Sequence, residues 1–244
     1  MPRFFMTGSS IGRGVAIVSG DDANHIKVLR MKIGDKIVIC DGEGNDHHCR
    51  IASIKNGEVE TEILKTEKNP GEPELKCTIL AGLPKGERAD FIVQKCTELG
   101  ASEIIFFMSE RCVARLDEKS LPKKVARFSR IAEEAAKQSG RGIVPTVSAL
   151  GSFAEALDVA MKTDLKLFMY ETGERKTMKA AIEAAGDIKT AAIITGPEGG
   201  FELFEAELAA RLGFDTCSMG ALILRCETAP IAALGALMYH SGNL

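Results

Sequence analysis

Residues 190–201 read TAAIITGPEGGF, and this stretch decides the fold that we expect for the chain. The apolar run 191–194 predicts a buried strand, and apolar residues recur at helical spacing from Phe201 onward. The glycine loop 196–200 separates the two, and its residues without Cβ allow backbone N–H groups to approach a bound molecule closely. A strand, a glycine loop and a helix in this order are typical of ligand-binding α/β proteins.

The charges around the glycine loop limit the ligand that it can hold. The loop matches neither the G-x-G-x-x-G nor the G-x-x-x-x-G-K-[ST] pattern of phosphate-binding loops. Carboxylates lie in it or just after it, at Glu198, Glu202, Glu205 and Glu207, and no Lys or Arg follows before Arg211. These carboxylates would repel an anionic phosphate but not a cationic or zwitterionic ligand. Acidic residues also complement the dipole at a helix start, so a purely structural turn is the alternative.

Strands and helices alternate along the chain after residue 75. The expected strands are 75–81, 103–108, 146–148, 165–170, 190–195 and 214–218, and the expected helices are 87–99, 119–138, 153–161, 176–185, 202–212 and 229–240. This alternation predicts an α/β domain with a mostly parallel sheet covered by helices. Ligands of such sheets bind at the carboxyl ends of the strands, where the loops 83–88, 196–200 and 219–228 stand out.

Residues 3–66 have a different pattern. Short strands are expected at 15–18, 36–40, 48–54 and 59–64, with one short helix at 22–30. Asn56-Gly57, between the last two strands, is a strong hairpin signal. Several short strands with tight turns predict a small β-barrel. Residues 67–74, EKNPGEPE, contain two prolines and a glycine and are the best candidate for a linker.

The composition is that of an ordinary globular protein, with 45% hydrophobic and 27% charged residues among 244. A net charge of −3 and a 5% aromatic content without Trp argue against a protein that coats nucleic acid regardless of its sequence. The charge is unevenly distributed, because residues 85–141 carry 12 basic and 9 acidic side chains. Lys123, Arg127 and Arg130 fall at helical spacing there, which indicates either an RNA-contacting face or an ordinary solvated one.

Cysteine and histidine usage argues against a metal site and a disulfide framework. The seven cysteines are an odd number and contain no C-x-x-C pair, which is typical of reduced thiols. The histidines indicate neither a metal site nor a catalytic triad. The start, MPRFFMTGSS, lacks the apolar run of a signal peptide, and the longest apolar stretch, 229–239, is too short to span a bilayer. We therefore expect a cytoplasmic protein without a membrane segment.

Arg225 stands in an apolar run just before the last helix, a costly place for a cation that has neither a partner nor a task. A salt bridge to Glu227 or Glu198 is the structural explanation, and a catalytic role is the functional one. The last helix is rich in alanine, which permits close packing either in the core or across a dimer interface.

Six motifs span nearly the whole chain in order. They are H-x-x-V-L-R at 25–30, K-G-E-R at 85–88, Q-K-x-T-E-L-G at 94–100, E-A-A-K-Q-S-G-R at 134–141, G-P-E-G-G-F at 196–201 and I-L-R-x-E-T-A at 223–229. Each motif alone is weak, but as a set they are specific. The set resembles the bacterial 16S ribosomal RNA (uracil-N3)-methyltransferase family of the SPOUT class.

The resemblance implies a fold and a set of partners. It implies an N-terminal PUA-like RNA-binding β-barrel at residues 1–70 and an α/β methyltransferase domain at 75–244, tied in a trefoil knot around its parallel sheet. It also implies a homodimer and S-adenosylmethionine as cofactor. The sulfonium of that cofactor is a cation, which agrees with the acidic glycine loop. The substrate would be a uridine of 16S rRNA near the decoding centre, within the assembled small ribosomal subunit.

The resemblance also implies site residues. The cofactor-binding candidates are Met169, Glu171, Thr195, Gly196, Pro197, Gly199, Gly200, Met219, Gly220, Ile223, Leu224 and Thr228, and the RNA-binding candidates are Arg3, His25, Arg30, Lys85, Arg88, Arg127, Lys137 and Arg141. Arg225 is the candidate for stabilising negative charge on the uracil carbonyl oxygens, and either Glu227 or solvent hydroxide would take the N3 proton. Relatives usually carry an arginine two residues before the Ile-Leu-Arg run, where this sequence has Ala221-Leu222.

Two other classes are weaker candidates. A nicotinamide oxidoreductase would need a phosphate-binding loop after the first strand of the α/β region, where residues 83–86 contain one glycine. A non-catalytic RNA-binding or ribosome-assembly protein would keep the barrel and the basic helix but would have no use for the glycine loop at 196–200.

Overall fold

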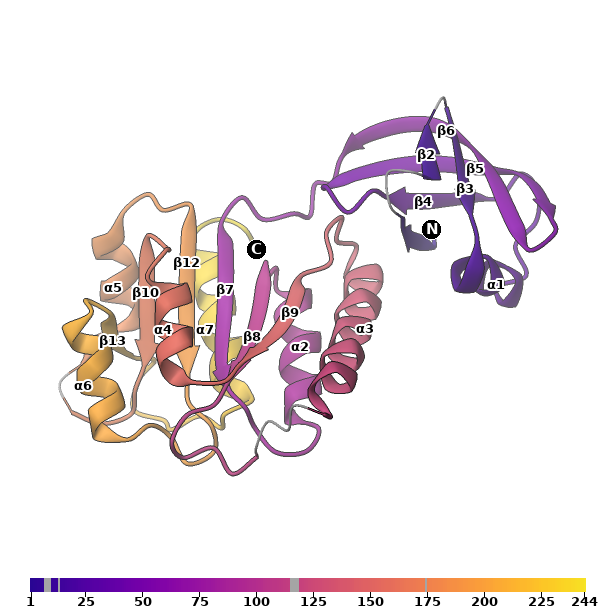
Figure 1. Cartoon of the computed structure of the whole chain (residues 1–244). Helices are drawn as coiled ribbons and strands as arrows, with labels where there is room; N and C mark the ends of the chain where they lie inside the picture. The colour runs from indigo at the N-terminus through magenta and orange to yellow at the C-terminus, as the bar shows by residue number, and fades with distance from the viewer. Residues whose placement is uncertain (7–9, 13, 115–118, 174) are drawn as a thin grey trace. The chain divides into compact units, whose positions relative to one another are not determined.

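The computed structural model of the chain describes residues 1–6, 10–12, 14–114, 119–173 and 175–244 (Figure 1). The chain forms two compact units. Unit 1 contains Met1–Glu72 together with Ala136–Val144, and unit 2 contains Pro73–Ala135 and Pro145–Leu244. The boundary between Glu72 and Pro73 lies inside the segment that the sequence indicates as a linker.

Unit 1 is built on a six-stranded sheet in the order β1-β4-β5-β6-β3-β2. Its strands are β1 (Arg3–Phe5), β2 (Ile11–Gly12), β3 (Val15–Val18), β4 (Lys36–Cys40), β5 (Asn45–Lys55) and β6 (Glu58–Lys68), and its helix is α1 (Gly20–Val28). β1 pairs with β4 in parallel and the other pairs are antiparallel. Asn56 and Gly57 join β5 to β6 with φ of 52° and 84°, as a tight hairpin turn requires. The core contains Phe4, Ala16, Val18, Ala23, Ile26, Ile37, Ile39, Cys49, Ile51 and Val59.

Two features of unit 1 go beyond the sequence-based expectation. The edge strands β1 and β2 are only three and two residues long, too short for a period to show. β6 runs on to Lys68, into the expected linker, and Asn69 after it is buried. The Nδ2 of Asn69 donates to Asp46 Oδ2 at 2.9 Å and to the carbonyl oxygen of Gly140 at 3.0 Å. The start of the expected linker is therefore ordered by contacts within unit 1.

Unit 2 contains a seven-stranded sheet in the order β11-β13-β10-β12-β7-β8-β9, in which all pairs are parallel. Its strands are β7 (Lys76–Gly82), β8 (Glu103–Phe107), β9 (Thr146–Leu150), β10 (Leu165–Met169), β11 (Lys176–Thr177), β12 (Thr190–Thr195) and β13 (Asp215–Ser218). Its helices are α2 (Arg88–Glu98), α3 (Leu121–Ser139), α4 (Phe153–Ala160), α5 (Met178–Ala185), α6 (Leu203–Arg211) and α7 (Thr228–His240), and the end of α3 is grouped with unit 1. The expected α/β fold with a parallel sheet is confirmed.

The stretch from which the fold was predicted lies in the middle of this sheet. β12 pairs with β10 on one side and with β7 on the other, and five of its six residues are buried. A strand covered on both faces needs an apolar run instead of an alternating one, which explains the sequence AAII. β7 and the loop after β12 lie so close that a Cβ on Gly82 would stand 2.5 Å from Pro197 Cδ. The absence of a side chain at Gly82 thus leaves the space that Pro197 of the glycine loop occupies.

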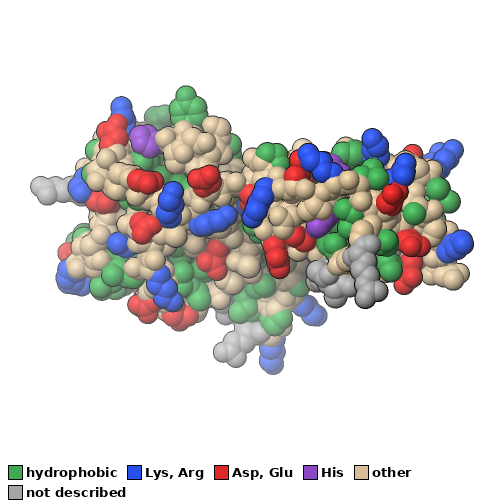
Figure 2. All heavy atoms as spheres, turned by 90° about the horizontal axis from the view of Figure 1, so that it is seen from above, with side chains coloured by type: hydrophobic (Ala, Val, Ile, Leu, Met, Phe, Trp, Pro, Cys, Tyr) green, Lys and Arg blue, Asp and Glu red, His purple; other side chains and the backbone are tan. Residues whose placement is uncertain are grey.

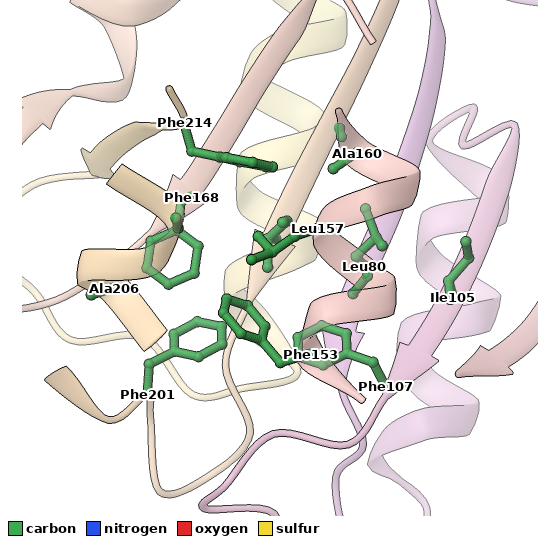
Figure 3. Close-up of a cluster of buried hydrophobic side chains, with 14 residues drawn as sticks. Leu80, Ile105, Phe107, Phe153, Leu157, Ala160, Phe168, Phe201, Ala206 and Phe214 are labelled. Carbon is green, nitrogen blue, oxygen red and sulfur yellow. The ribbon is translucent and has the colours of Figure 1, made fainter. Parts of the chain in front are cut away.

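Helices cover both faces of the sheet, with α4 in front of it and α7 behind it in the view of Figure 1. One face is packed by a cluster of buried residues from β7, β8, β10, β12, α4 and α6 (Figure 3). Phe201 is central to this cluster, because its ring centroid lies 4.5 Å from that of Phe168 and 5.5 Å from that of Phe153. Phe201 therefore anchors the end of the glycine loop in the core.

Candidate functional site

A cavity of about 630 Å³ opens at the carboxyl ends of β10, β12 and β13, a size typical of small-molecule sites. Its lining comprises Arg88, Met169, Tyr170, Glu171, Arg175, Thr195, Gly196, Pro197, Glu198, Gly200, Cys217, Ser218, Met219, Gly220, Ala221, Leu222, Ile223, Leu224, Arg225, Cys226, Glu227 and Ala229. The location agrees with the rule for parallel sheets, because the loops after parallel strands meet at one edge.

The glycine loop forms one part of this lining through a tight turn. The N–H of Gly200 donates to the carbonyl oxygen of Pro197 at 3.0 Å, and Gly200 has a φ of 69°, which residues with a Cβ rarely adopt. A Cβ on Gly200 would also lie 2.5 Å from Glu171 Oε1. The carboxylate of Glu171 thus lies directly against the glycine, and both residues line the cavity.

Thr195, the last residue of β12, brings a hydroxyl group to the cavity. Its side chain is almost fully buried, with the residue 1% exposed, and Oγ1 has no hydrogen-bond partner in the described part of the chain. A buried hydroxyl without a partner is unusual in a folded protein. This unsatisfied group is therefore an observation that favours a bound ligand in the cavity.

Two carboxylates of the lining pair with Arg88 at the start of α2. Glu198 accepts a hydrogen bond from Arg88 Nη1 and another from the backbone N–H of Lys85 at 2.8 Å, and Glu227 Oε2 lies 3.6 Å from Arg88 Nε. Partial burial acts to raise the pKa of Glu198, but these donors outweigh it and leave the pKa below its ordinary value. Glu198 is therefore ionised at neutral pH.

Glu227 is ionised for a similar reason. Partial burial acts to raise its pKa, but the backbone N–H of Glu227, the Cys226 thiol and the charges of Arg88 and Arg225 together lower it. The neighbouring Cys226 thiol donates to Glu227 Oε2 at 3.2 Å, and burial raises its pKa to about 12. Cys226 thus remains a protonated thiol at neutral pH, and the carboxylate of Glu227 is the hydrogen-bond acceptor of this pair.

Arg225 has a different environment from Arg88. Its residue is exposed and lines the cavity, and among the described residues no ion pair or hydrogen bond involves its guanidinium. The salt bridge that the sequence suggested between Arg225 and Glu227 or Glu198 is absent from the described contacts, because both carboxylates pair with Arg88 instead. The guanidinium of Arg225 is therefore available to a bound molecule.

Contacts away from the cavity lining explain two other acidic residues of this stretch, Glu202 and Glu205. Arg111 donates from Nε and Nη2 to the carboxylate of Glu202, at 2.7 and 3.0 Å, and from Nη1 to the carbonyl oxygen of Gly199 at 3.1 Å. Buried Glu205 accepts bonds from the Ser109 hydroxyl and the Glu110 N–H, and it caps α6 together with Glu202. Glu202 and Glu205 thus serve the helix start and the loop after β8, and neither lines the cavity.

Most of the predicted cofactor-binding residues meet at the cavity. Met169, Glu171, Thr195, Gly196, Pro197, Gly200, Met219, Gly220, Ile223 and Leu224 line it, as do the catalytic candidates Arg225 and Glu227. Gly199 and Thr228 do not belong to the lining, and a Cβ on Gly199 would lie 2.9 Å from Arg111 Cβ. Tyr170 and Ser218 also line the cavity, in agreement with the expectation that the cofactor lies near residues 169–171 and near the strand end at Ser218. Sequence reasoning missed Arg175, which directly precedes β11. It also missed Arg111, for which only the position after β8 was a signal.

The predicted RNA-binding residues divide into paired and exposed groups. In unit 1, Arg3 pairs with Asp46 at 2.6 Å, Lys137 with Asp22 at 3.1 Å and Arg141 with Glu72 at 2.9 Å, and in unit 2, Arg127 pairs with Asp90 at 2.8 Å. His25, Arg30 and Lys85 are exposed. Basic and acidic side chains are interspersed on the face drawn in Figure 2. Ion pairing thus gives several of the candidates a structural contact, and their role in RNA binding stays a prediction.

The described residues contain no group of three or more His, Cys, Asp or Glu side chains that could hold a metal ion. None of the helices in the described part of the chain is both long and apolar enough to cross a membrane.

Comparison with known proteins gives matches along nearly the whole chain. Residues 71–238 match the RNA methyltransferase domain, and residues 18–64 match the RNA methyltransferase PUA domain. The chain is 36% identical over 229 residues to ribosomal RNA small subunit methyltransferase E of Bacillus subtilis, with 92% of this chain and 90% of that protein covered. It is 30% identical over 234 residues to the protein of the same name from Mesomycoplasma hyopneumoniae, at 96% and 97% coverage.

Solved structures show the same agreement in three dimensions. Ribosomal RNA small subunit methyltransferase E from Neisseria gonorrhoeae, bound to S-adenosyl methionine, is 32% identical and superposes with a TM-score of 0.84 over 98% of both chains. A methyltransferase from Legionella pneumophila in complex with the same cofactor is 29% identical, with a TM-score of 0.86 over 98% of this chain and 97% of that one. The expected arrangement of an N-terminal PUA domain before a parallel α/β domain is confirmed.

Proposed function

The chain belongs to the RNA methyltransferase family, and from that premise we propose that it methylates small-subunit ribosomal RNA with S-adenosylmethionine. The acceptor in this proposal is N3 of a uridine in 16S rRNA near the decoding centre. The motifs that carry the resemblance to the uracil-N3 methyltransferases support this finer assignment, since all six occur in order along the chain.

The observation that carries the proposal is the match between the cavity and the cofactor. Among the described residues, Glu171, Glu198 and Glu227 line the cavity, and Arg88 pairs with the last two. No ion pair with a described residue involves the carboxylate of Glu171, so it suits a ligand that bears a sulfonium and an ammonium group. The buried Thr195 hydroxyl, which has no partner among the described residues, can donate to or accept from the polar groups of the ligand. The glycines of the loop 196–200 lack a Cβ, so the backbone can come close to the ligand. The residues present therefore fit the cofactor.

The proposed reaction requires removal of the proton from uridine N3 and transfer of a methyl group to that nitrogen. When bound, the cofactor supplies a methyl group on a positively charged sulfur that leaves as a neutral thioether. The uridine N3 must lose its proton before its lone pair can attack, and Glu227, ionised and at the cavity, can accept that proton. Solvent hydroxide is the alternative acceptor. The N3–H bond breaks and its proton goes to the acceptor, and the new bond forms between N3 and the methyl carbon. The negative charge of the uracil anion and the positive charge of the sulfonium cancel in the products.

Arg225 stabilises the anionic uracil in this proposal. Loss of the N3 proton spreads negative charge onto the two flanking carbonyl oxygens, and a fixed cation near them lowers the barrier. Arg225 is exposed at the cavity and its guanidinium has no ion-pair partner among the described residues, so it can meet these oxygens. Because N3 lies on the base-pairing edge, the target base must be unpaired or flipped out to reach the site.

Recognition of the RNA and assembly of the protein complete the proposal. Residues 1–70 serve as the RNA-binding PUA-like domain and 75–244 as the knotted methyltransferase domain, with His25, Arg30 and Lys85 as exposed RNA contacts. Leu222 and Ile223 are each 83% exposed beside the cavity, and such uncovered apolar side chains support a homodimer that buries them. The protein acts in the cytoplasm, where its ribosomal substrate is found.

The test combines calorimetry with methyl transfer. The wild-type protein is titrated with S-adenosylmethionine, then incubated with radiolabelled cofactor and either small subunits or naked 16S rRNA that lack the modification. We expect binding, transfer to the assembled subunit and a product that mass spectrometry identifies as N3-methyluridine. Arg225→Ala should bind the cofactor within a few-fold of wild type but transfer no methyl group. Transfer to another atom of the base would contradict the uracil-N3 assignment, and absence of both binding and transfer would favour a non-catalytic RNA-binding protein.

A further inference from the structure

Arg88 lies between two carboxylates that belong to different lining segments of the cavity. Glu198 belongs to the glycine loop after β12, and Glu227 belongs to the segment that connects β13 to α7. Arg88 Nη1 donates to Glu198, and Arg88 Nε lies 3.6 Å from Glu227 Oε2. One guanidinium thus contacts two chain segments that are separated by almost thirty residues in sequence and that are joined through Arg88.

The backbone around Arg88 strengthens this contact. Arg88 is the first residue of α2, and the turn before it places the N–H of Lys85 2.8 Å from Glu198 Oε1. The same carboxylate is therefore held from the main chain and from a side chain of one turn. A guanidinium presents several donors in a rigid plane, so it can serve two carboxylates at once in a way that the single ammonium of lysine cannot reproduce.

Arg88 and Arg225 have opposite environments within one cavity. Arg88 is 39% exposed at the side chain and is engaged by both carboxylates, whereas Arg225 has no ion pair with the described residues. An arginine that turns its donors to an RNA phosphate weakens its contacts with its protein partners, and here Glu198 and Glu227 would lose the counter-ion that they share. This cost argues against Arg88 as an RNA ligand, which is the role suggested by its motif.

We infer that Arg88 is a positioning residue that holds the glycine loop and the Glu227 segment together in the arrangement that binds the cofactor. This inference rests on the proposed function, because it concerns the same cavity. In this inference Arg88 acts through Glu198 and Glu227. Its loss should loosen both segments, weaken cofactor binding and reduce turnover, while RNA affinity remains close to that of the wild type.

The first experiment tests, without any ligand, whether Arg88 holds the two lining segments in place. Hydrogen exchange followed by mass spectrometry is carried out on the ligand-free wild type, Arg88→Ala, Arg88→Lys and the control Arg211→Ala, whose side chain lies on the exposed end of α6. Arg88→Ala should speed exchange in peptides that cover 196–202 and 219–227, and Arg88→Lys should do so partially. Peptides from β10 should not change, and Arg211→Ala should match the wild type. Unchanged exchange in both segments of Arg88→Ala would overturn the inference, whether or not the protein binds the cofactor.

The second experiment is a double-mutant cycle read by calorimetry with S-adenosylmethionine. Arg88→Ala should weaken binding by about tenfold or more, the range expected for hydrogen bonds to charged groups. In the background of Glu198→Gln with Glu227→Gln, the same substitution should cost less than about threefold, since its partners are already neutral. An equal cost in both backgrounds would show that Arg88 affects cofactor binding without the two carboxylates, and it would overturn the inference. A cofactor affinity within twofold of wild type, combined with a large loss of affinity for 16S rRNA, would show that Arg88 contacts RNA instead. Absence of cofactor binding by the wild type itself would refute the proposed function, and the exchange data would still decide the role of Arg88.

Discussion

Arg141 and Glu72 form a bidentate ion pair inside unit 1, with Arg141 Nε 3.2 Å from Glu72 Oε1 and Arg141 Nη2 2.9 Å from Glu72 Oε2. Their side chains are only 4% and 9% exposed. Glu72 Oε1 also accepts the backbone N–H groups of Gly142 and Ile143, at 2.9 and 3.0 Å. This carboxylate therefore fastens residues 141–143 to the end of the segment that precedes Pro73, and it gives Arg141 a structural contact in place of an exposed one.

Arg141→Met should destabilise the protein by about 3–5 kcal/mol, because it leaves the buried carboxylate of Glu72 without its counter-ion. Urea unfolding followed by circular dichroism measures the change. Arg50→Met is the matched control, since Arg50 pairs with Glu62 at 2.7 Å with both side chains about half exposed. The control should cost less than about 1 kcal/mol. Similar losses for the two variants would show that the Arg141 pair is no more important than a surface pair.

Gly200→Ala should abolish or strongly weaken cofactor binding. The substitution introduces a Cβ that meets Glu171 Oε1 at 2.5 Å, and the carboxylate must move out of its place in the cavity. Gly213→Ala is the control, because Gly213 has a similar φ of 81° but open space around the added atom. Both variants should lose about 1–2 kcal/mol of stability from the backbone conformation, but only Gly200→Ala should change the dissociation constant, by about tenfold or more. Equal cofactor affinities of the two variants would show that Gly200 does not belong to the binding site.

Thr195→Val should leave the ligand-free protein as stable as the wild type or raise its melting temperature, because it removes a buried hydroxyl that has no partner in the described chain. Cofactor affinity should fall by up to about tenfold through loss of a hydrogen bond. Thr61→Val provides the converse control, since buried Thr61 donates to the carbonyl oxygen of Ala16 at 3.0 Å. It should cost about 1 kcal/mol of stability and leave cofactor affinity unchanged. A stability loss in Thr195→Val like that of the control would indicate a protein partner for the hydroxyl.

Glu202→Gln should make stability less sensitive to acid. The hydrogen bond from Arg111 lowers the pKa of Glu202 below its ordinary value of 4.5, so the folded state holds the ionised form more strongly than the unfolded state does. The wild type therefore has this stabilisation above the ordinary pKa and loses it as the pH falls through the folded pKa. Thermal unfolding at a series of pH values should show a shallower acid decline for Glu202→Gln. Glu207→Gln, on the exposed side of the same helix, should keep the wild-type slope.

Much of the fold and of the cavity could be predicted because their signals are local. The run 191–194 is apolar throughout since its strand is covered on both faces, and the alternation of strands and helices after residue 75 indicates the parallel sheet. The cavity residues in the glycine loop and before α7 follow directly from the ends of β12 and β13. Glycine, proline and strand signals act over a few residues, so they are readable without a structure.

Only the tertiary structure decided which charges meet. Arg88 pairs with Glu198 and Glu227, Arg111 with Glu202, and Arg141 with Glu72, each across a long sequence separation. The pairings of Arg88 and Arg111 depend on the order of the strands in unit 2, in which β12 lies between β10 and β7, and no local pattern specifies that order. The pair of Arg141 and Glu72 depends instead on the packing that groups residues 136–144 with unit 1. The sequence thus determined where the glycine loop lies on its strand and that its surroundings are acidic. The fold decided which carboxylates line the cavity and which arginine pairs with each paired carboxylate, because an ion pair forms only between groups that packing brings within a few ångströms.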